Sequence, residues 1–267
     1  MQLTSFTDIT SNYQHIYISP HFDDVVYSCG GTIGLQSRQG QRPLVITVFA
    51  GIPPSERKLS SFALKMHKRM GFYQDAATVI TSRRQEDANA LTYLQADYLW
   101  LNYVDALYRG VPAHYKHRWS ICGKVHPHDM WISQQLAQDL LTIHKQLPEA
   151  TWYAPLSMGN HVDHQIVFAA VQPLLHKAHV QFYEDFPYAL QTRSLQQRLK
   201  RIGGTLQPMV VEISDMLHPR QQAAELYTSQ LTLNFGSKEL MHTSMQDYTQ
   251  SMCRGKMGHV ERFWITV

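Results

Sequence analysis

Apolar runs of strand length alternate with stretches of helical spacing along the first part of the chain. The run at 43–50 is nearly continuous in apolar residues, as in a strand buried on both faces of a parallel sheet. Shorter runs at 15–19 and 97–101 also have strand character. Helical spacing is found at 61–70 and 83–94, between the runs at 43–50 and 97–101. A turn and a helix follow the first run. This order predicts an α/β fold with a mostly parallel sheet.

The second half of the chain continues the alternation, although one long segment interrupts it. Between residues 108 and 128 periodicity is lost, and glycines, prolines, histidines and aromatic residues collect. A loop of this length in a compact domain is usually functional or mobile. The remaining predicted elements are strands at 150–155, 180–183 and 209–213, and helices at 131–146, 162–175 and 220–231.

Two clusters of acidic residues and histidines stand where a predicted strand gives way to a helix. One occupies residues 19–24 and contains Pro-His-Phe-Asp-Asp, and the other occupies residues 159–164 and contains His-Val-Asp-His. In an open α/β sheet, the loops at the carboxyl ends of the strands gather into one crevice. We therefore expect these distant clusters to form a single site.

The residue types in the clusters favour a catalytic metal centre. Catalytic zinc takes three ligands from histidine and carboxylate side chains and keeps a fourth position for water. His21, Asp24 and His164 can supply such a set. Asp23 lies next to a proposed ligand but projects differently in a tight turn, so it is available to take a proton from the attacking water.

A second set of groups could stabilise charge. His161 and His164 are three residues apart at a helix start and so lie on roughly one face, and Asp163 is close enough to orient and charge one of them. A water activator and a cationic oxyanion stabiliser are then both present. The pattern predicts metal-assisted hydrolysis of a carbonyl derivative.

Length and composition limit the remaining classes. With 267 residues and 44% hydrophobic content the chain can bury a sizeable core, and we expect one domain over 1–267. No apolar run is long enough to span a bilayer and the polar start lacks signal-peptide features, so we expect a cytoplasmic protein without a membrane span. A net charge of +3 from interspersed residues predicts no nucleic-acid partner. The three cysteines are scattered, which argues against a disulfide framework.

At the two clusters the sequence resembles a known family. Residues 20–24 are similar to the Pro-His-Xaa-Asp-Asp motif, and residues 161–164 to the His-Xaa-Asp-His motif, of the LmbE-like, or PIG-L-like, zinc N-deacetylases. Either motif alone is weakly specific, whereas the pair, in order and in strand-to-helix context, is a strong signal. The resemblance continues through residues 28–32, 83–87, Asp105, 183–188, 227–231 and 261–264.

The resemblance implies a three-layer αβα, Rossmann-like fold of the LmbE type, with a mostly parallel sheet. It also implies removal of an N-acetyl group from an N-acetylglucosamine-type amino sugar or conjugate, which would be the small-molecule partner. Arg83 and Asp105 match positions that contact the sugar or its aglycone in relatives, and Glu184 is a further candidate contact.

The roles of the motif residues follow from the same resemblance. His21, Asp24 and His164 would bind Zn²⁺, and ferrous iron is accepted by the same ligand types. Asp23 would be the general base that activates the water. His161 would stabilise the oxyanion together with the metal, and Asp163 would tune its charge.

The sequence departs from the family pattern at two positions. Val25 stands where the first motif often continues with an acidic residue, and Gly159 stands where some members have a tyrosine two residues before the oxyanion histidine. Two alternatives stay open. One is a metallophosphoesterase with two metals, because sites of histidine and aspartate also serve phosphoryl transfer. The other is a catalytically silent sugar-binding relative, in which the departure at Gly159 reflects a lost oxyanion site. The sequence identifies neither the acetylated substrate nor the oligomeric state, and a homo-oligomer is compatible with it. The loop histidines are expected to be solvated rather than a second metal site; they are His114, His117, His126 and His128.

Overall fold

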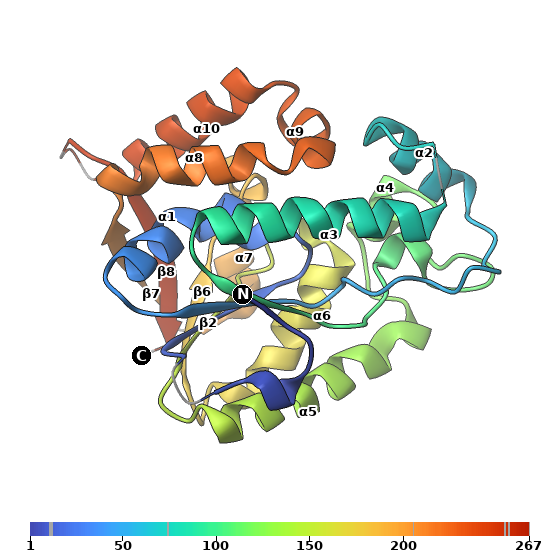
Figure 1. Ribbon diagram of the computed structural model, residues 1–267, viewed down its shortest axis with the longest axis horizontal. Helices are drawn as coiled ribbons and strands as arrows, with labels where there is room; N and C mark the ends of the chain where they lie inside the picture. The colour runs from blue at the N-terminus through green and yellow to red at the C-terminus, as the bar shows by residue number, and fades with distance from the viewer. Residues whose placement is uncertain (11–12, 74, 205, 254, 256, 267) are drawn as a thin grey trace.

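The structure, a computed structural model, describes residues 1–10, 13–73, 75–204, 206–253, 255 and 257–266 (Figure 1). Within these residues, eight strands form one sheet in the order β1-β4-β3-β2-β5-β6-β8-β7. Neighbours from β1 to β6 pair in parallel, and β8 runs antiparallel to both β6 and β7. The strands are β1 (Gln2–Leu3), β2 (His15–Ser19), β3 (Pro43–Thr47), β4 (Asp97–Trp100), β5 (Thr151–Pro155), β6 (His179–Tyr183), β7 (Leu206–Glu212) and β8 (Val260–Thr266).

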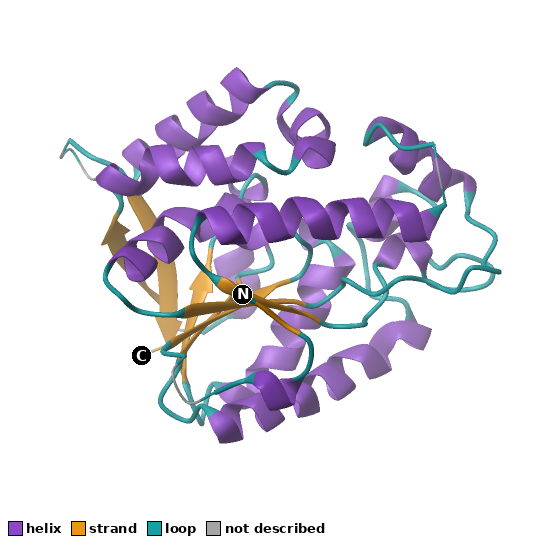
Figure 2. Ribbon diagram, viewed as in Figure 1, coloured by secondary structure: helices purple, strands orange, loops and turns teal. Residues whose placement is uncertain are grey.

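Helices cover both faces of the sheet, which confirms the three-layer α/β architecture expected from the sequence. Helices α1, α3 and α8 lie on one side, with α9 and α10 beyond α8, while α5 and α6 lie on the other (Figures 1 and 2). The helices are α1 (Asp24–Arg38), α2 (Ser61–Arg69), α3 (Ala76–Tyr93), α4 (Arg118–Ile121), α5 (Met130–Gln146), α6 (Val162–Val171), α7 (Ser194–Ile202), α8 (Leu217–Glu225), α9 (Thr228–Phe235) and α10 (Lys238–Ser251). Among the described residues, none of these helices is long and apolar enough to cross a bilayer.

The alternation of side chains along β2 explains why its sequence is apolar throughout. Ile16 and Ile18 point into the core that contains Leu136 of α5, whereas Tyr17 points into the core that contains Leu91 of α3. Successive side chains of a strand face opposite sides of the sheet, and here both sides are covered by helices. All five of these residues are fully buried.

Strands β2 and β5 are direct neighbours in the middle of the sheet. His15 pairs with Thr151 and Tyr17 with Tyr153, in parallel. Each strand is followed by one of the two motif segments. The pairing therefore brings residues 19–24 and 159–164 to the same edge of the sheet, as expected for an open α/β fold.

Helix α1 is kinked next to its paired glycines. Cys29 leaves helical geometry, with φ −143°. The N–H groups of Gly31 and Thr32 then donate to the carboxylate of Glu261 on β8, over 2.9 and 2.7 Å. A Cβ on residue 31 would lie 2.8 Å from Glu261 Oε1, so this approach requires glycine.

One predicted helix is wrong. The segment at 220–231 forms two helices, α8 and α9, with a break at Tyr227 (φ −83°, ψ 60°). The hydroxyl of Tyr227 donates to Asp87 over 2.8 Å, and Glu86 accepts from the N–H of Ser229 over 2.8 Å. These bonds to α3 supply partners to the start of α9, which helical spacing alone cannot reveal.

Other element bounds also differ from the prediction. Helix α3 begins at Ala76 instead of residue 83, because Asp75 caps it by accepting from the N–H of Thr78 over 2.9 Å. The segment at 108–128 is largely irregular, as expected, with the short helix α4 inside it and a 3₁₀ turn at each end, at 106–108 and 127–129. Helices α7 and α10 and strand β8 were not predicted from the pattern.

Candidate metal centre and active site

The three predicted metal ligands converge on one point. His21 Nδ1 lies 3.1 Å from Asp24 Oδ2, and His164 Nε2 lies 3.3 Å from the same oxygen. His164 and Asp24 are buried, and His21 is nearly so. The structure thus brings residues from both motifs together, because His21 follows β2, His164 follows β5, and these two strands are neighbours in the sheet.

The turn after β2 fixes the first two ligands. Asp24 is the first residue of α1, and its Oδ2 accepts the N–H of His21 over 2.8 Å. Ser19 Oγ accepts the N–H of Val25 over 3.2 Å, so the start of the helix is held against the end of the strand. An acidic side chain in the first turn also interacts favourably with the helix dipole.

Each histidine presents one ring nitrogen to Asp24 and has the other held by a second carboxylate. His164 Nδ1 lies 2.6 Å from Asp185 Oδ1, and His21 Nε2 lies 2.9 Å from Asp163 Oδ2. Histidines that bind metals are typically oriented in this way. His164 Nε2 is buried and, among the described residues, forms no hydrogen bond of good geometry, despite its 3.3 Å approach to Asp24. This donor set fits a divalent metal ion.

The electrostatics of the cluster agree with that fit. Burial lowers the pKa of His164, but Asp24 and Asp185 outweigh this and raise it to about 9. Burial raises the pKa of Asp24, yet His164 and His21 hold it well below its usual range. Positive charge is therefore stabilised between these side chains, at the position where a cation would be bound.

His161 lies beside the same cluster. Its ring and that of His21 meet edge to face with 4.8 Å between centroids, and ring nitrogens of His21, His161 and His164 lie within 4.8 Å of one another. His161 Nδ1 accepts the N–H of Asp163 over 3.2 Å at the start of α6. The ring proton of neutral His161 is therefore on Nε2. Burial, followed by the charge of His21, lowers the pKa of His161 well below its ordinary value.

The carboxylate of Asp163 contacts other residues than those expected. Its Oδ2 lies 2.9 Å from His21 Nε2 and accepts the N–H of Ala106 over 3.1 Å, while Oδ1 lies 2.6 Å from Arg109. Burial raises the pKa of Asp163, but Arg109 and His21 hold it well below its usual range. Asp163 therefore orients His21 through its carboxylate and touches His161 only through its backbone.

Asp23 is held on both oxygens by residues that are not candidate metal ligands. Arg83 donates to its Oδ1 over 3.2 Å, and the amide of Asn234 on α9 donates to its Oδ2 over 3.3 Å. Burial and the charge of Asp24 raise the pKa of Asp23, and Arg83 opposes them. A raised pKa brings a carboxylate closer to the range of an effective general base.

The three candidate substrate contacts have different surroundings. Asp105 Oδ2 lies 3.8 Å from His21 Nε2 and 3.9 Å from Arg83, so these two residues join the cluster. The carboxylate of Glu184 is buried and is bound by Arg262, over 2.5 Å, and by Trp264, over 2.8 Å. Glu184 thus faces β8, and the structure does not bring it to the other candidates.

Three residues in the site were missed by the sequence analysis: Asp185, Arg109 and Asn234. Only Asp185 had a usable signal, because a carboxylate is the usual second partner of a metal-binding histidine and an acidic pair follows β6. Arg109 lies in the irregular 108–128 segment. Asn234 comes from α9, far along the chain from Asp23.

Tyr188 covers the position at which this chain has Gly159. Residue 159 has φ +77°, and a Cβ there would lie 2.2 Å from the Tyr188 ring. The same ring stands 5.6 Å from that of His164, edge to face. An aromatic side chain therefore borders the motif here, contributed by a later segment than residue 159 itself.

Comparisons with known proteins agree with this site and fold. The model of the family PIG-L, GlcNAc-PI de-N-acetylase, matches residues 16–175. The chain is 29% identical over 264 residues to a 2'-N-acetylparomamine deacetylase of Niallia circulans, covering 94% of this chain and 90% of that protein. It is 28% identical over 223 residues to the enzyme of the same name from Streptomyces fradiae, covering 80% and 72%. The crystal structure of the zinc-inhibited form of a teicoplanin deacetylase has a TM-score of 0.77 at 25% identity, covering 93% and 96%.

Proposed function

The chain belongs to the PIG-L family of GlcNAc-PI de-N-acetylases and is an amidohydrolase. We propose that it removes the N-acetyl group from an amino sugar within a glycoconjugate. The observation that carries this proposal is the convergence of His21, Asp24 and His164 beside Asp23. Three metal-type donors next to a separately held carboxylate are the groups needed to hydrolyse an amide.

We propose that His21, Asp24 and His164 hold zinc, with Asp185 and Asp163 orienting the two imidazoles. When bound, the ion polarises the acetamide carbonyl and makes a water molecule more acidic. Ferrous iron suits the same ligands. The zinc-inhibited form of the similar teicoplanin deacetylase supports a role for metal in this fold.

Asp23 is the proposed general base. It takes a proton from the water that attacks the carbonyl carbon, and it returns that proton to the nitrogen when the C–N bond breaks. The products are acetate and a free amine. Arg83 and Asn234 donate to the two carboxylate oxygens of Asp23, so the group that accepts and returns the proton is held in a fixed orientation.

His161 is the proposed oxyanion stabiliser. Because its Nδ1 accepts a backbone N–H, its Nε2–H is free to donate to the carbonyl oxygen as negative charge develops there. Neutral His161 can make this donation, so the protonated His161 expected from the sequence is not required. Removing one such donor typically costs about 100-fold or more in rate.

The proposed substrate class rests on the relatives. Two of them are named for 2'-N-acetylparomamine, and one solved neighbour is a teicoplanin deacetylase complexed with teicoplanin. We propose an acetylated amino sugar attached to a larger group, with Asp105 and Arg83 closest to the sugar. For Glu184 we propose a structural role, since its carboxylate is bound to Arg262 and Trp264.

Acetate release tests this proposal. The zinc-loaded protein is incubated with 2'-N-acetylparomamine, N-acetylglucosamine and an acetylated glycopeptide, and acetate release is measured. In parallel, phosphate release is measured with matched phosphorylated sugars. We expect acetate release from at least one acetylated substrate, and release that is about 100-fold slower or more in an Asp23→Asn variant. Phosphate release with two metals per chain would favour the phosphoesterase, and saturable sugar binding without turnover would favour the silent relative.

A further inference from the structure

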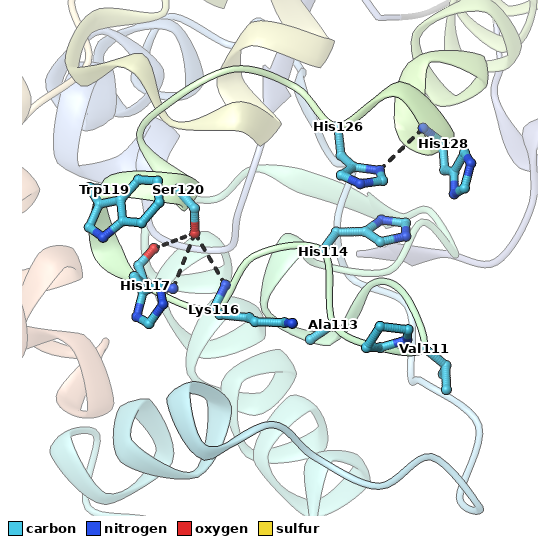
Figure 3. Close-up of a pocket in the computed structure, with 10 residues that line it drawn as sticks. Val111, Ala113, His114, Lys116, His117, Trp119, Ser120, His126 and His128 are labelled. Atoms are coloured by element: carbon cyan, nitrogen blue, oxygen red, sulfur yellow. Dashed lines mark hydrogen bonds between the residues drawn. The ribbon is translucent and has the colours of Figure 1, made fainter.

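Three histidines of the 108–128 segment form a second cluster, outside the site at His21. His114, His126 and His128 each offer a ring nitrogen within 4.8 Å of the others. The rings of His114 and His126 stack with 3.9 Å between centroids (Figure 3). His117 lines the same pocket but stacks on Trp119 instead. From the sequence, all four histidines were expected to be solvated loop residues, whereas in the structure the rings of His114, His126 and His128 lie close together.

The ring nitrogens of this cluster are available for binding. His114 Nδ1 lies 2.9 Å from Asp129 Oδ1, which directs its proton there and leaves Nε2 as an acceptor. His126 Nδ1 accepts the N–H of His128 over 3.3 Å, so its Nε2 is the remaining nitrogen. The ring of His128 is exposed and has no hydrogen bond within the described residues.

The position of His114 is set by buried groups. Asp129, which is 3% exposed, also accepts from the hydroxyl of Tyr115 over 2.8 Å and pairs with Arg109 over 3.0 Å. Gly110 has φ +85°, and a Cβ there would lie 2.1 Å from the His114 ring. The ring is therefore seated against backbone and oriented by a fixed carboxylate, as is common for metal-binding histidines.

The chemistry of three imidazoles selects the ligand. Neutral imidazole suits zinc, copper and nickel, whereas magnesium and calcium require oxygen ligands. Zinc–nitrogen bonds are about 2.0–2.1 Å long, so nitrogens on one ion lie closer together than the 4.8 Å limit within which these three lie. Binding therefore turns the His126 ring out of its stack with His114, and the exposed His128 side chain can rotate toward the ion. Lys116 lines the same pocket, but it is exposed and free to extend into solvent.

We propose that His114, His126 and His128 form a second binding site for a divalent transition metal, Zn²⁺ or Cu²⁺, separate from the one formed by His21, Asp24 and His164. Solvent completes the coordination, because the pocket is open on the side of His128. The proposal does not depend on the deacetylase activity, since its residues are not those assigned to that reaction.

Metal binding to the full chain without a purification tag tests the proposal. Metal-free protein is dialysed against Zn²⁺ near pH 7.5, and bound zinc is measured by elemental analysis. We expect two ions per chain for the wild type and one for the double variant His126→Asn/His128→Asn. His117→Asn is the matched control, because it removes a histidine from the same pocket but outside the cluster, and it should retain two.

A second measurement identifies the ligands directly. Protein already holding one equivalent of zinc is given one equivalent of Cu²⁺, and the EPR spectrum should show hyperfine coupling to about three imidazole nitrogens. The double variant should lose that coupling while circular dichroism and acetate release stay at wild-type values. An equal zinc content in the wild type and the double variant would overturn the proposal.

Discussion

The amide of Asn234 donates to Oδ2 of Asp23 over 3.3 Å, although 211 residues separate them in the chain. Arg83 holds the other oxygen of the same carboxylate. The proposed general base is therefore positioned by one residue from α3 and one from α9, on the face of the sheet that α1 also covers. Neither partner is a candidate metal ligand.

Replacing Asn234 with alanine should lower kcat about tenfold and leave KM almost unchanged. The Asp23 carboxylate would keep its bond to Arg83 but lose its second donor, and hydrogen bonds to charged groups contribute about 1.5–3 kcal/mol. Steady-state kinetics together with the pH–rate profile measure this effect. The acidic limb, which reports the ionisation of the general base, should shift to higher pH in Asn234→Ala but not in the control Thr232→Ala on the same helix. An unchanged profile would mean that Asn234 does not position the base.

Asp23 and His164 should separate catalysis from metal binding. Asp23→Asn should keep the metal and lose about 100-fold or more in kcat, because only the proton acceptor is removed. His164→Ala should lose both, because it removes a ligand. Bound metal and acetate release, measured on the same samples, distinguish the two. Near-normal turnover by Asp23→Asn would refute its role.

The adjacent residues Glu184 and Asp185 offer a matched pair. Asp185→Asn should weaken metal binding about 10–100-fold, because Asp185 orients His164, and activity should return at high metal concentration. Glu184→Gln should leave metal affinity unchanged and lower the thermal midpoint instead, since its carboxylate binds Arg262 and Trp264. Competition with a chelator measures the affinity. Equal effects of the two variants on metal affinity would contradict this division.

Gly159→Ala should lower the free energy of unfolding by at least about 1–2 kcal/mol. Residue 159 has φ +77°, which is costly for any residue with a Cβ, and that Cβ would meet the Tyr188 ring at 2.2 Å. Urea unfolding measures the loss. The control Gly204→Ala, with no atom within 4 Å of its Cβ, should change stability by no more than about 0.5 kcal/mol. Part of the loss should disappear in a Tyr188→Ala background.

Asp87 should make stability fall as pH rises from about 4 to about 7. Burial raises its pKa from 3.8 to about 7, against the hydrogen bonds from Trp100 and Tyr227. The unfolded chain releases this proton near pH 4 and the folded chain only near pH 7, so each pH unit between them costs the fold up to about 1.4 kcal/mol. Unfolding curves of wild type and Asp87→Asn measure the difference. The advantage of the wild type over the variant should shrink across that range, and a constant difference would exclude the effect.

The sequence predicted the parts of the fold and site that depend on local pattern. The strands before the two motifs were predicted because each is an apolar run that ends at a motif. His21, Asp23 and Asp24 were predicted because they share one turn. The break between α8 and α9 was missed because it depends on Tyr227 reaching Asp87, a contact between distant segments.

Glu184 and Asp185 illustrate the limit for the site. Successive residues at a strand end point in opposite directions, so one faces β8 and the other faces His164. Which of the two does so depends on the pairing of β6 with β8, and nothing in the local sequence indicates that pairing.

The pairing of β2 with β5 also has a consequence for the order of folding. The bond between His21 and Asp163 closes a chain separation of 142 residues, and contacts of such long range form late because the entropy of a large loop must be lost first. A metal at this point would therefore bind only after the centre of the sheet has assembled. Zinc should slow unfolding of the native protein, while the rate of refolding from denaturant should be nearly the same with and without it.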